Sequence, residues 1–135
     1  MKDHKNTLGK SERLKRRKAI EQLFKKGKHF SVFPLRVSYA FIPYIETSLQ
    51  AGFSASSRHF GKSTDRNRLK RLMREAYRLH KHQLQDATVQ SNVKLALFFV
   101  YVGKELPDYA IVSEKIGVIL QRLTGIVHEA NPQNT

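Results

Sequence analysis

The sequence of 135 residues contains no cysteine and only 11 acidic residues. Without cysteine the chain has no disulfide, no thiolate metal site and no thiol nucleophile. No apolar run approaches the ~20 residues that cross a membrane, and the N-terminus is too charged for a signal peptide. These absences predict a cytoplasmic protein. Because 40% of its residues are hydrophobic, we expect it to fold around a core of its own.

Positive charge is in large excess and lies mainly in two segments. The chain has 25 Lys and Arg, a net charge of +14 and a pI near 10.3. Residues 1–28 hold 11 Lys and Arg against 3 acids, and residues 58–81 hold 9 against 2. A chain this basic attracts polyanions, and the clustering is typical of a binding surface for nucleic acid or an anionic membrane.

The periodicity of apolar residues predicts a single α+β domain. Helical spacing gives the predicted helices, whereas alternation or a continuous apolar run gives the predicted strands. We predict a flexible basic arm over residues 1–12, a domain over residues 13–130 and a C-terminal tail over residues 131–135. The predicted helices cover residues 13–26, about 66–84 and 107–130, and the predicted strands cover residues 29–33 (a short edge strand), 35–42, 49–55 (antiparallel to the strand before it) and 93–102.

The helix predicted from about residue 66 has two sides of opposite character. Exposed helical sides usually mix charge signs, because like charges at i,i+4 spacing destabilise a helix by a few tenths of a kcal/mol. Here the exposed side has no acid, and Glu75 lies at its edge. The predicted core side comprises Leu69, Leu72, Met73, Ala76 and Leu79, and the predicted exposed side comprises Asn67, Lys70, Arg71, Arg74, Arg78 and Lys81.

The excess of one charge sign on this side predicts that it binds the phosphates of a nucleic acid. Arginine outnumbers lysine in residues 66–78. A planar guanidinium can contact a phosphate through two N–H groups and stack on a base, which suits folded RNA. The residues alone leave DNA open as the alternative.

Residues 66–75 (RNRLKRLMRE) resemble the RNR signature, R-N-R-x-K-R-x-x-R-E, of the bacterial ribonuclease P protein family. Residues 52–54 resemble the strand before that signature, residues 14–27 resemble the N-terminal helix, and the resemblance covers about residues 13–125. It implies an α+β fold, a single-domain αβββαβα sandwich that is ribosomal protein S5 domain 2-like. Its mixed sheet would carry a left-handed crossover at the signature helix, against the usual handedness.

The resemblance also implies the activity and the partners. Members of this family are the accessory subunit of an endoribonuclease that removes the 5′ leader of precursor tRNA. The catalytic RNA and its bound Mg²⁺ perform the chemistry, so we expect no cofactor in the protein itself. The implied partners are the ribonuclease P RNA and precursor tRNA, with other structured RNAs as further candidates and no membrane.

The resemblance implies two groups of RNA-contacting residues. Ile20 occupies a position where many members have an aromatic residue. The implied contacts to the catalytic RNA are Arg58, Lys62, Arg66, Asn67, Arg68, Lys70, Arg71, Arg74 and Arg78. The implied cleft for the 5′ leader comprises Arg13, Lys15, Arg16, Ile20, Phe24 and Tyr39.

The sequence predicts no autonomous active site. Its six histidines are scattered and its acids are dispersed, so neither a general base nor a Mg²⁺ site can be assigned. Several aromatic residues of the first third of the chain could stack on bases, although we expect Phe41 in the core. Two other classes stay open: a structural RNA-binding protein of ribosomal type, and a DNA-binding domain that reads the major groove with residues 66–81.

Overall fold

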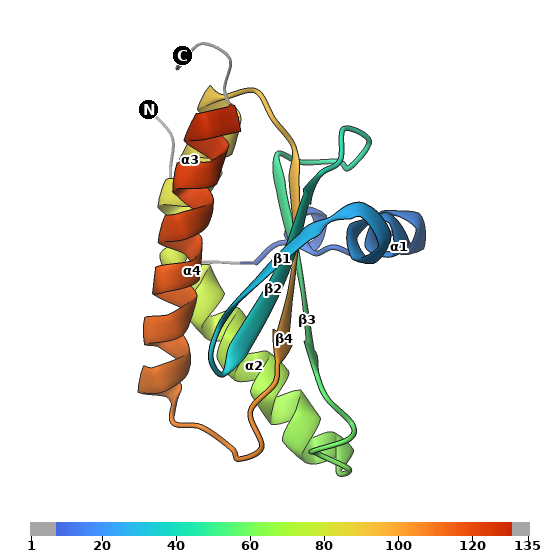
Figure 1. The fold of residues 1–135 in the computed structure, drawn as a ribbon, viewed down its shortest axis with the longest axis vertical. Helices are drawn as coiled ribbons and strands as arrows, with labels where there is room; N and C mark the ends of the chain where they lie inside the picture. The colour runs from blue at the N-terminus through green and yellow to red at the C-terminus, as the bar shows by residue number, and fades with distance from the viewer. Residues whose placement is uncertain (1–7, 131–135) are drawn as a thin grey trace.

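Four strands form one mixed sheet, and helices cover both of its faces (Figure 1). The computed structural model describes residues 8–130. The elements in chain order are η1 (Lys10–Glu12), α1 (Arg17–Lys26), β1 (Lys28–Val32), β2 (Leu35–Phe41), β3 (Leu49–Ala55), α2 (Ser63–His80), α3 (His82–Gln90), β4 (Leu95–Tyr101) and α4 (Tyr109–Ala130). Helix α1 packs on one face of the sheet, α2 and α4 pack on the other, and α3 packs on α4. The predicted αβββαβα sandwich is confirmed, with its second helix divided in two.

The strand order β1-β2-β4-β3 makes the sheet mixed. Strands β1 and β4 are antiparallel to β2, whereas β3 is parallel to β4. The predicted edge strand is therefore confirmed as β1, and β3 is antiparallel to β2 in direction although β4 lies between them. The connection from β3 to β4 runs through α2 and α3 and is the expected crossover. Its left-handedness stays a prediction.

Strand β4 contributes side chains to two cores, which explains its continuous apolar run. Alternate residues of a strand face opposite sides of the sheet. One set joins the main core under α2 and α4, and the other joins a smaller core under α1. The first set is Leu95, Leu97, Phe99 and Tyr101, and the second is Ala96 and Phe98. The apolar stripe of α4 is also buried in the main core, as predicted, through Val112, Ile116, Leu120, Leu123 and Val127.

Three aromatic rings fix how α2 sits on the sheet. Phe53 of β3 stacks on Phe99 of β4 with ring centroids 5.4 Å apart. Tyr77 of α2 meets both rings edge to face, at 5.5 Å from Phe53 and 5.8 Å from Phe99. Because Tyr77 is fully buried in this cluster, it sets the rotation of α2 about its own axis.

The prediction for the second helix is wrong in three details. The helix begins at Ser63, about three residues earlier than expected, and it ends at His80 before α3 begins. Leu79, which we expected in the core, is 43% exposed. The buried stripe is Leu69, Met73, Ala76 and Tyr77, and at ~100° per residue Leu79 lies roughly 100° from its centre. Phe41 is likewise exposed rather than buried.

Residues 8–14 of the N-terminal segment pack against the rest of the domain. Residues 1–7 of the predicted arm and the predicted tail 131–135 lie outside the described residues. Leu8 packs against the main core, and the Leu14 N–H donates to the Ala51 carbonyl at 3.0 Å. Arg13 pairs with Ala51 in a parallel bridge. Residues 8–14 therefore cover the outer edge of β3, so the domain extends further towards the N-terminus than predicted.

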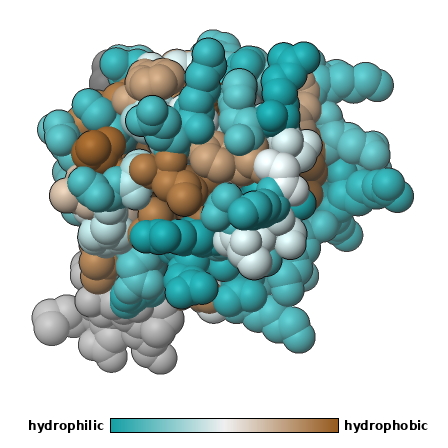
Figure 2. All heavy atoms as spheres, turned by 90° about the horizontal axis from the view of Figure 1, so that it is seen from below, coloured by the Kyte–Doolittle hydropathy of each residue, from teal (hydrophilic) through white to brown (hydrophobic). Residues whose placement is uncertain are grey.

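One end of the sheet carries an apolar depression. Figure 2 shows this end from below, with apolar surface framed by hydrophilic side chains. The exposed apolar residues Phe33, Leu106 and Ile111 contribute to a depression of about 710 Å³ between the β1–β2 turn and the loop after β4. Two lysines and two acids, Lys104, Lys115, Glu105 and Asp108, also line it, so the depression has no excess of cations to attract phosphate.

Gly27→Ala should destabilise the domain, because the backbone around this residue has no room for a side chain. Gly27 ends α1 with φ −74°, so it is not a left-handed glycine. A Cβ would lie 2.3 Å from the Leu23 carbonyl oxygen and 2.9 Å from that of Tyr39. We expect a loss of about 2 kcal/mol in the free energy of unfolding, measured with urea.

Gly125→Ala is the matched control for that experiment. Gly125 lies inside α4, and a Cβ there would meet nothing within 4 Å. Alanine is the better helix former by ~1 kcal/mol, so this variant should be more stable than the parent chain. Equal effects of the two substitutions would contradict the close approach at Gly27.

Candidate nucleic-acid interface

The first turns of α2 present cations to solvent. Arg68 and Arg71 are exposed, and Lys70 and Arg74 are partly exposed. In the described part of the chain, none of these four side chains forms an ion pair with a carboxylate. Asn67 is exposed beside them. The structure therefore brings five of the predicted RNA-binding residues together on one uncompensated surface, which we call the α2 cationic face (residues 67, 68, 70, 71 and 74).

The other end of α2 differs from the prediction. Arg78 is partly exposed and forms an ion pair with Glu75, one turn earlier. Lys81, which we expected on the exposed side, is only 2% exposed and forms an ion pair with Glu12. Its placement on the exposed side was wrong, because its long side chain turns inward where α2 meets α3. Within residues 8–130, carboxylates thus compensate the C-terminal end of α2 but not its first three turns.

Arg66 holds the loop before α2. Its Nη1 donates to the carbonyl oxygens of Phe60 at 2.7 Å and Gly61 at 3.0 Å. Phe60 is buried against the Tyr101 ring, with centroids 5.9 Å apart. The loop therefore has a fixed shape. The family resemblance implied that Arg66 contacts the RNA. Nothing in the sequence indicated its hydrogen bonds to the loop carbonyls.

The same loop adds positive charge to the beginning of α2. Arg58 and Lys62 are exposed, and Lys62 caps the helix without a side-chain hydrogen bond. The N–H groups of the first helical turn carry the positive end of the helix dipole, which favours an anion nearby. This end of α2 and the α2 cationic face therefore form one continuous surface that suits phosphate.

The predicted leader residues are divided among three places. Ile20 and Phe24 lie one turn apart on α1 and line a shallow depression of about 400 Å³. Phe24 is 46% exposed, and its ring packs edge to face with that of Phe98, with centroids 5.1 Å apart. Tyr39 instead packs on the main core, on the other face of the sheet, with its ring 6.0 Å from that of Phe30.

The two-residue period of a strand is sufficient to predict which side of the sheet Tyr39 faces. Tyr39 lies two and four residues from Val37 and Leu35, both buried in the main core, so all three face the same side of β2. The structure does not bring Tyr39 together with Phe24.

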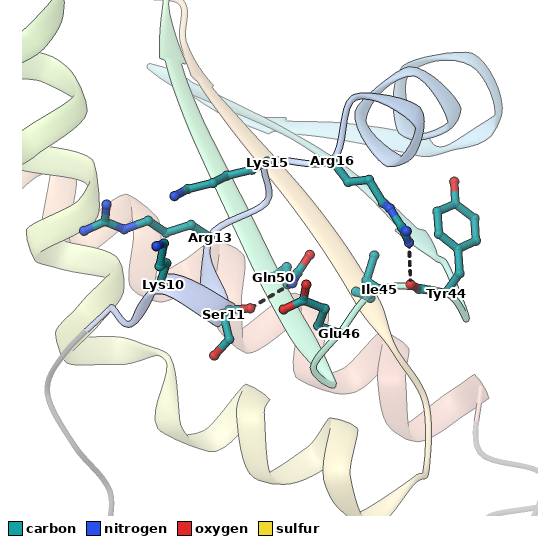
Figure 3. Close-up of a pocket in the computed structure, with 9 residues that line it drawn as sticks. All are labelled: Lys10, Ser11, Arg13, Lys15, Arg16, Tyr44, Ile45, Glu46 and Gln50. Atoms are coloured by element: carbon teal, nitrogen blue, oxygen red, sulfur yellow. Dashed lines mark hydrogen bonds between the residues drawn. The ribbon is translucent and has the colours of Figure 1, made fainter.

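The three predicted cations of the leader cleft line a groove beside α1. In Figure 3, Lys10, Arg13 and Lys15 lie on one side of this groove and Arg16 on the other. We call it the N-terminal groove; its volume is about 690 Å³. It is lined by Lys10, Ser11, Arg13, Lys15, Arg16, Tyr44, Ile45, Glu46 and Gln50.

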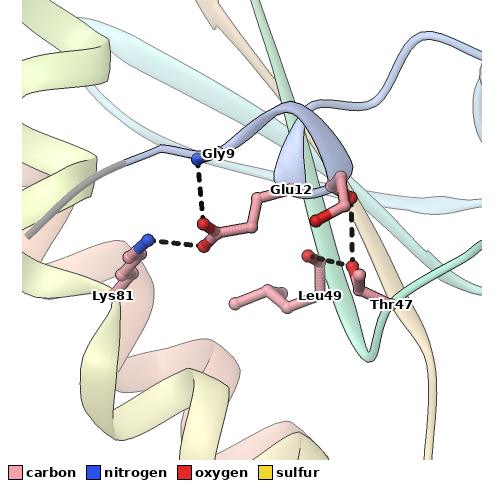
Figure 4. A network of polar contacts seen from close by, with 6 residues as sticks. Gly9, Glu12, Thr47, Leu49 and Lys81 are labelled. Carbon is pink, nitrogen blue, oxygen red and sulfur yellow. Dashed lines mark hydrogen bonds and ion pairs between the residues drawn. The ribbon is translucent and has the colours of Figure 1, made fainter. Parts of the chain in front are cut away.

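A polar network fixes the segment that forms this groove (Figure 4). Glu12 accepts a hydrogen bond from the Gly9 N–H at 2.9 Å and forms the ion pair with buried Lys81. The Thr47 hydroxyl donates to the carbonyl oxygens of Ser11 and Leu49, at 3.2 and 3.0 Å. The segment is thereby attached both to β3 and to the junction of α2 with α3.

Burial, and to a lesser extent the Glu12 carboxylate, raise the pKa of the Tyr77 phenol well above its ordinary value. Tyr77 therefore stays neutral at physiological pH, as its place in the aromatic cluster requires.

Within residues 8–130 no group of three or more His, Asp or Glu side chains is placed to hold a metal ion. The same part of the chain has no helix long and apolar enough to span a bilayer.

Fold and surface together define a small α+β domain with one helix whose exposed side is cationic. A family model described as Ribonuclease P matches residues 8–124. The ribonuclease P protein component of Porphyromonas gingivalis is 37% identical over 132 residues, which cover 94% of this chain and 93% of that protein. The one from Chlorobium phaeobacteroides is 30% identical over 131 residues, covering 89% and 90%. The chain belongs to the ribonuclease P protein family.

Solved structures of the same family share the fold. The ribonuclease P protein from Thermotoga maritima superimposes with a TM-score of 0.64 at 27% identity, over 82% of this chain and 96% of that one. The Staphylococcus aureus protein gives a TM-score of 0.66 at 17% identity, over 82% and 94%. Family membership makes the chain a subunit of an endoribonuclease with a role in tRNA processing.

Glu12→Gln should destabilise the domain, because it removes the Glu12 carboxylate from the buried Lys81 ammonium. We expect a loss of about 2 kcal/mol in the free energy of unfolding, measured by denaturant titration. The control is Glu21→Gln, which removes the exposed i,i+4 pair of Glu21 with Arg17 and should cost less than about 0.5 kcal/mol. A Glu12 variant as stable as the Glu21 variant would show that the buried pair does not hold the segment.

Proposed function

We propose that this chain binds the catalytic RNA of ribonuclease P through the α2 cationic face and the 5′ leader of precursor tRNA through α1. It thereby assists removal of the leader to give the mature 5′ end. One observation carries the proposal. The four cations of the α2 cationic face are uncompensated within the described chain, whereas the last turn of the same helix is neutralised. Family membership supports RNA as the polyanion.

The contribution to the reaction is electrostatic and positional. Two RNAs that approach each other repel through their phosphates, and a basic protein between them relieves that repulsion. The protein supplies no catalytic group in this proposal, and Mg²⁺ bound by the RNA subunit performs the chemistry. The loop that Arg66 holds against α2 adds Arg58 and Lys62 to the contact.

The leader would lie across α1. Phe24 offers an exposed ring that Phe98 supports from behind. Stacking of a base on such a ring contributes ~1–3 kcal/mol and tolerates any base, as a binder of different leaders requires. Ile20 beside it offers apolar contact without a second stacking ring, and Tyr39 takes no part because it faces the main core.

Arg71→Glu should weaken assembly with the catalytic RNA. The test is reconstitution with a bacterial ribonuclease P RNA at low Mg²⁺, with cleavage of precursor tRNA as the readout. We expect the parent chain to accelerate cleavage and the variant to require roughly tenfold more protein, since a phosphate contact becomes a repulsion. Lys104→Glu, on the exposed loop after β4, is the control. A parent chain without effect on cleavage would refute the proposed function.

Phe24→Ala should lower the preference for precursor over mature tRNA without weakening assembly with the catalytic RNA. Loss of one stacked base predicts a roughly tenfold weaker binding of precursor tRNA to the holoenzyme. Phe33→Ala is the matched control, because Phe33 is the more exposed ring at 72% and lies away from α1. Equal losses for precursor and mature tRNA would contradict a leader contact at Phe24.

A further inference from the structure

The basic side chains at the C-terminal end of α2 all have partners within the domain. Arg78 forms an ion pair with Glu75. His80 Nε2 lies 2.9 Å from the Ser113 hydroxyl oxygen of α4, and Lys81 is buried in the ion pair described above. The four cations of the α2 cationic face have no carboxylate partner in the described chain. The positive charge that α2 offers to a ligand therefore ends before the last turn of the helix.

Glu75 lies where this change occurs. Its side chain is 47% exposed, and it follows Arg71 by four residues, a spacing at which two side chains of a helix can form an ion pair. The carboxylate pairs instead with Arg78, one turn towards the C-terminus. Glu75 therefore neutralises the next cation along the helix, and Arg71 has no carboxylate partner among the residues that the structure describes.

A helix with positive charge along its whole length would bind many RNAs equally well. Non-specific binding comes from phosphate contacts, which need no sequence and let a protein slide along a nucleic acid. Specificity improves when a contact that only the wrong partners make becomes unfavourable, and like charges placed side by side have this effect. A carboxylate at the end of a cationic surface penalises a polyanion that extends past it. It has little effect on one whose phosphates end there.

We propose that Glu75 is a specificity-determining residue, which confines phosphate contacts to the α2 cationic face and the loop before it. Glu75 acts in two ways: it occupies the Arg78 guanidinium, and it repels a phosphate placed beside it. The catalytic RNA keeps its contacts, whereas an RNA held only by phosphate contacts loses those beyond the face. The proposal rests on the proposed function and adds to it what excludes the wrong RNA.

The test compares binding of the full chain to a bacterial ribonuclease P RNA and to an unrelated RNA duplex, measured by filter binding at about 50–200 mM salt. Glu75→Gln should strengthen duplex binding roughly threefold. It should also steepen the slope of log affinity against log salt by about 0.9, the value for one additional phosphate contact. Binding of the ribonuclease P RNA should stay the same, so the ratio of the two affinities falls.

Glu114→Gln on α4 is the matched control, because it causes the same change in net charge. Glu114 is 68% exposed and lies 3.9 Å from Lys115 of its own helix. This variant should change the binding of neither RNA. Because lost stability cannot strengthen binding, a gain in duplex affinity that is confined to Glu75→Gln would support the proposal.

Unchanged duplex binding in Glu75→Gln, an equal gain for both RNAs, or an equal gain in Glu114→Gln would overturn the proposal. Weaker binding of the ribonuclease P RNA would also overturn it, because Glu75 would then support a contact with that RNA. If Arg71→Glu still impaired reconstitution in any of these cases, the proposed function would stand while the role of Glu75 failed.

Discussion

The contact of Tyr77 with Phe53 and Phe99 is the constraint on which the surface of this protein depends. It fixes α2 on the sheet in one rotation, with Leu69 and Met73 facing inward. Once that rotation is fixed, Arg68 and Arg71 must point to solvent. The cost of keeping like charges on one helical side is only a few tenths of a kcal/mol per pair, far less than the gain from burying an aromatic cluster. The hydrophobic core therefore maintains a charge pattern that electrostatics alone would disfavour.

The chain neutralises its cations selectively. Arg78 pairs with Glu75, and Lys81 pairs with Glu12. The second ion pair holds the N-terminal segment against the junction of α2 and α3. The cations of the first turns of α2 and of the N-terminal groove have none in the described residues. Charge thus has two roles in one small domain. Buried at the junction, it holds elements together, and on the α2 cationic face and in the N-terminal groove it stays uncompensated by the described carboxylates.

The sequence predicted the elements well wherever the apolar pattern was unambiguous. The stripe of α4 was identified by its helical period, and β4 was identified by its continuous apolar run, because its two sides face two cores. The inward turn of Lys81 could not be predicted, because its partner Glu12 lies 69 residues away and only the fold brings them together. Docking of residues 8–12 was missed for the same reason, since a polar segment gives no periodic signal. The alternation of side chains along β2 was sufficient to predict that Tyr39 faces the main core. The resemblance to the family led instead to its assignment to the leader cleft.

The most direct test of the central claim is the salt dependence of binding to a bacterial ribonuclease P RNA. If the α2 cationic face and the loop before it contact about six phosphates, affinity should fall roughly a thousandfold between about 50 and 200 mM salt. Arg71→Gln should reduce the slope of log affinity against log salt by about 1. A dependence as shallow as about tenfold, or a slope that Arg71→Gln leaves unchanged, would contradict the account, because the exposed cations would then not contact the phosphates of the RNA.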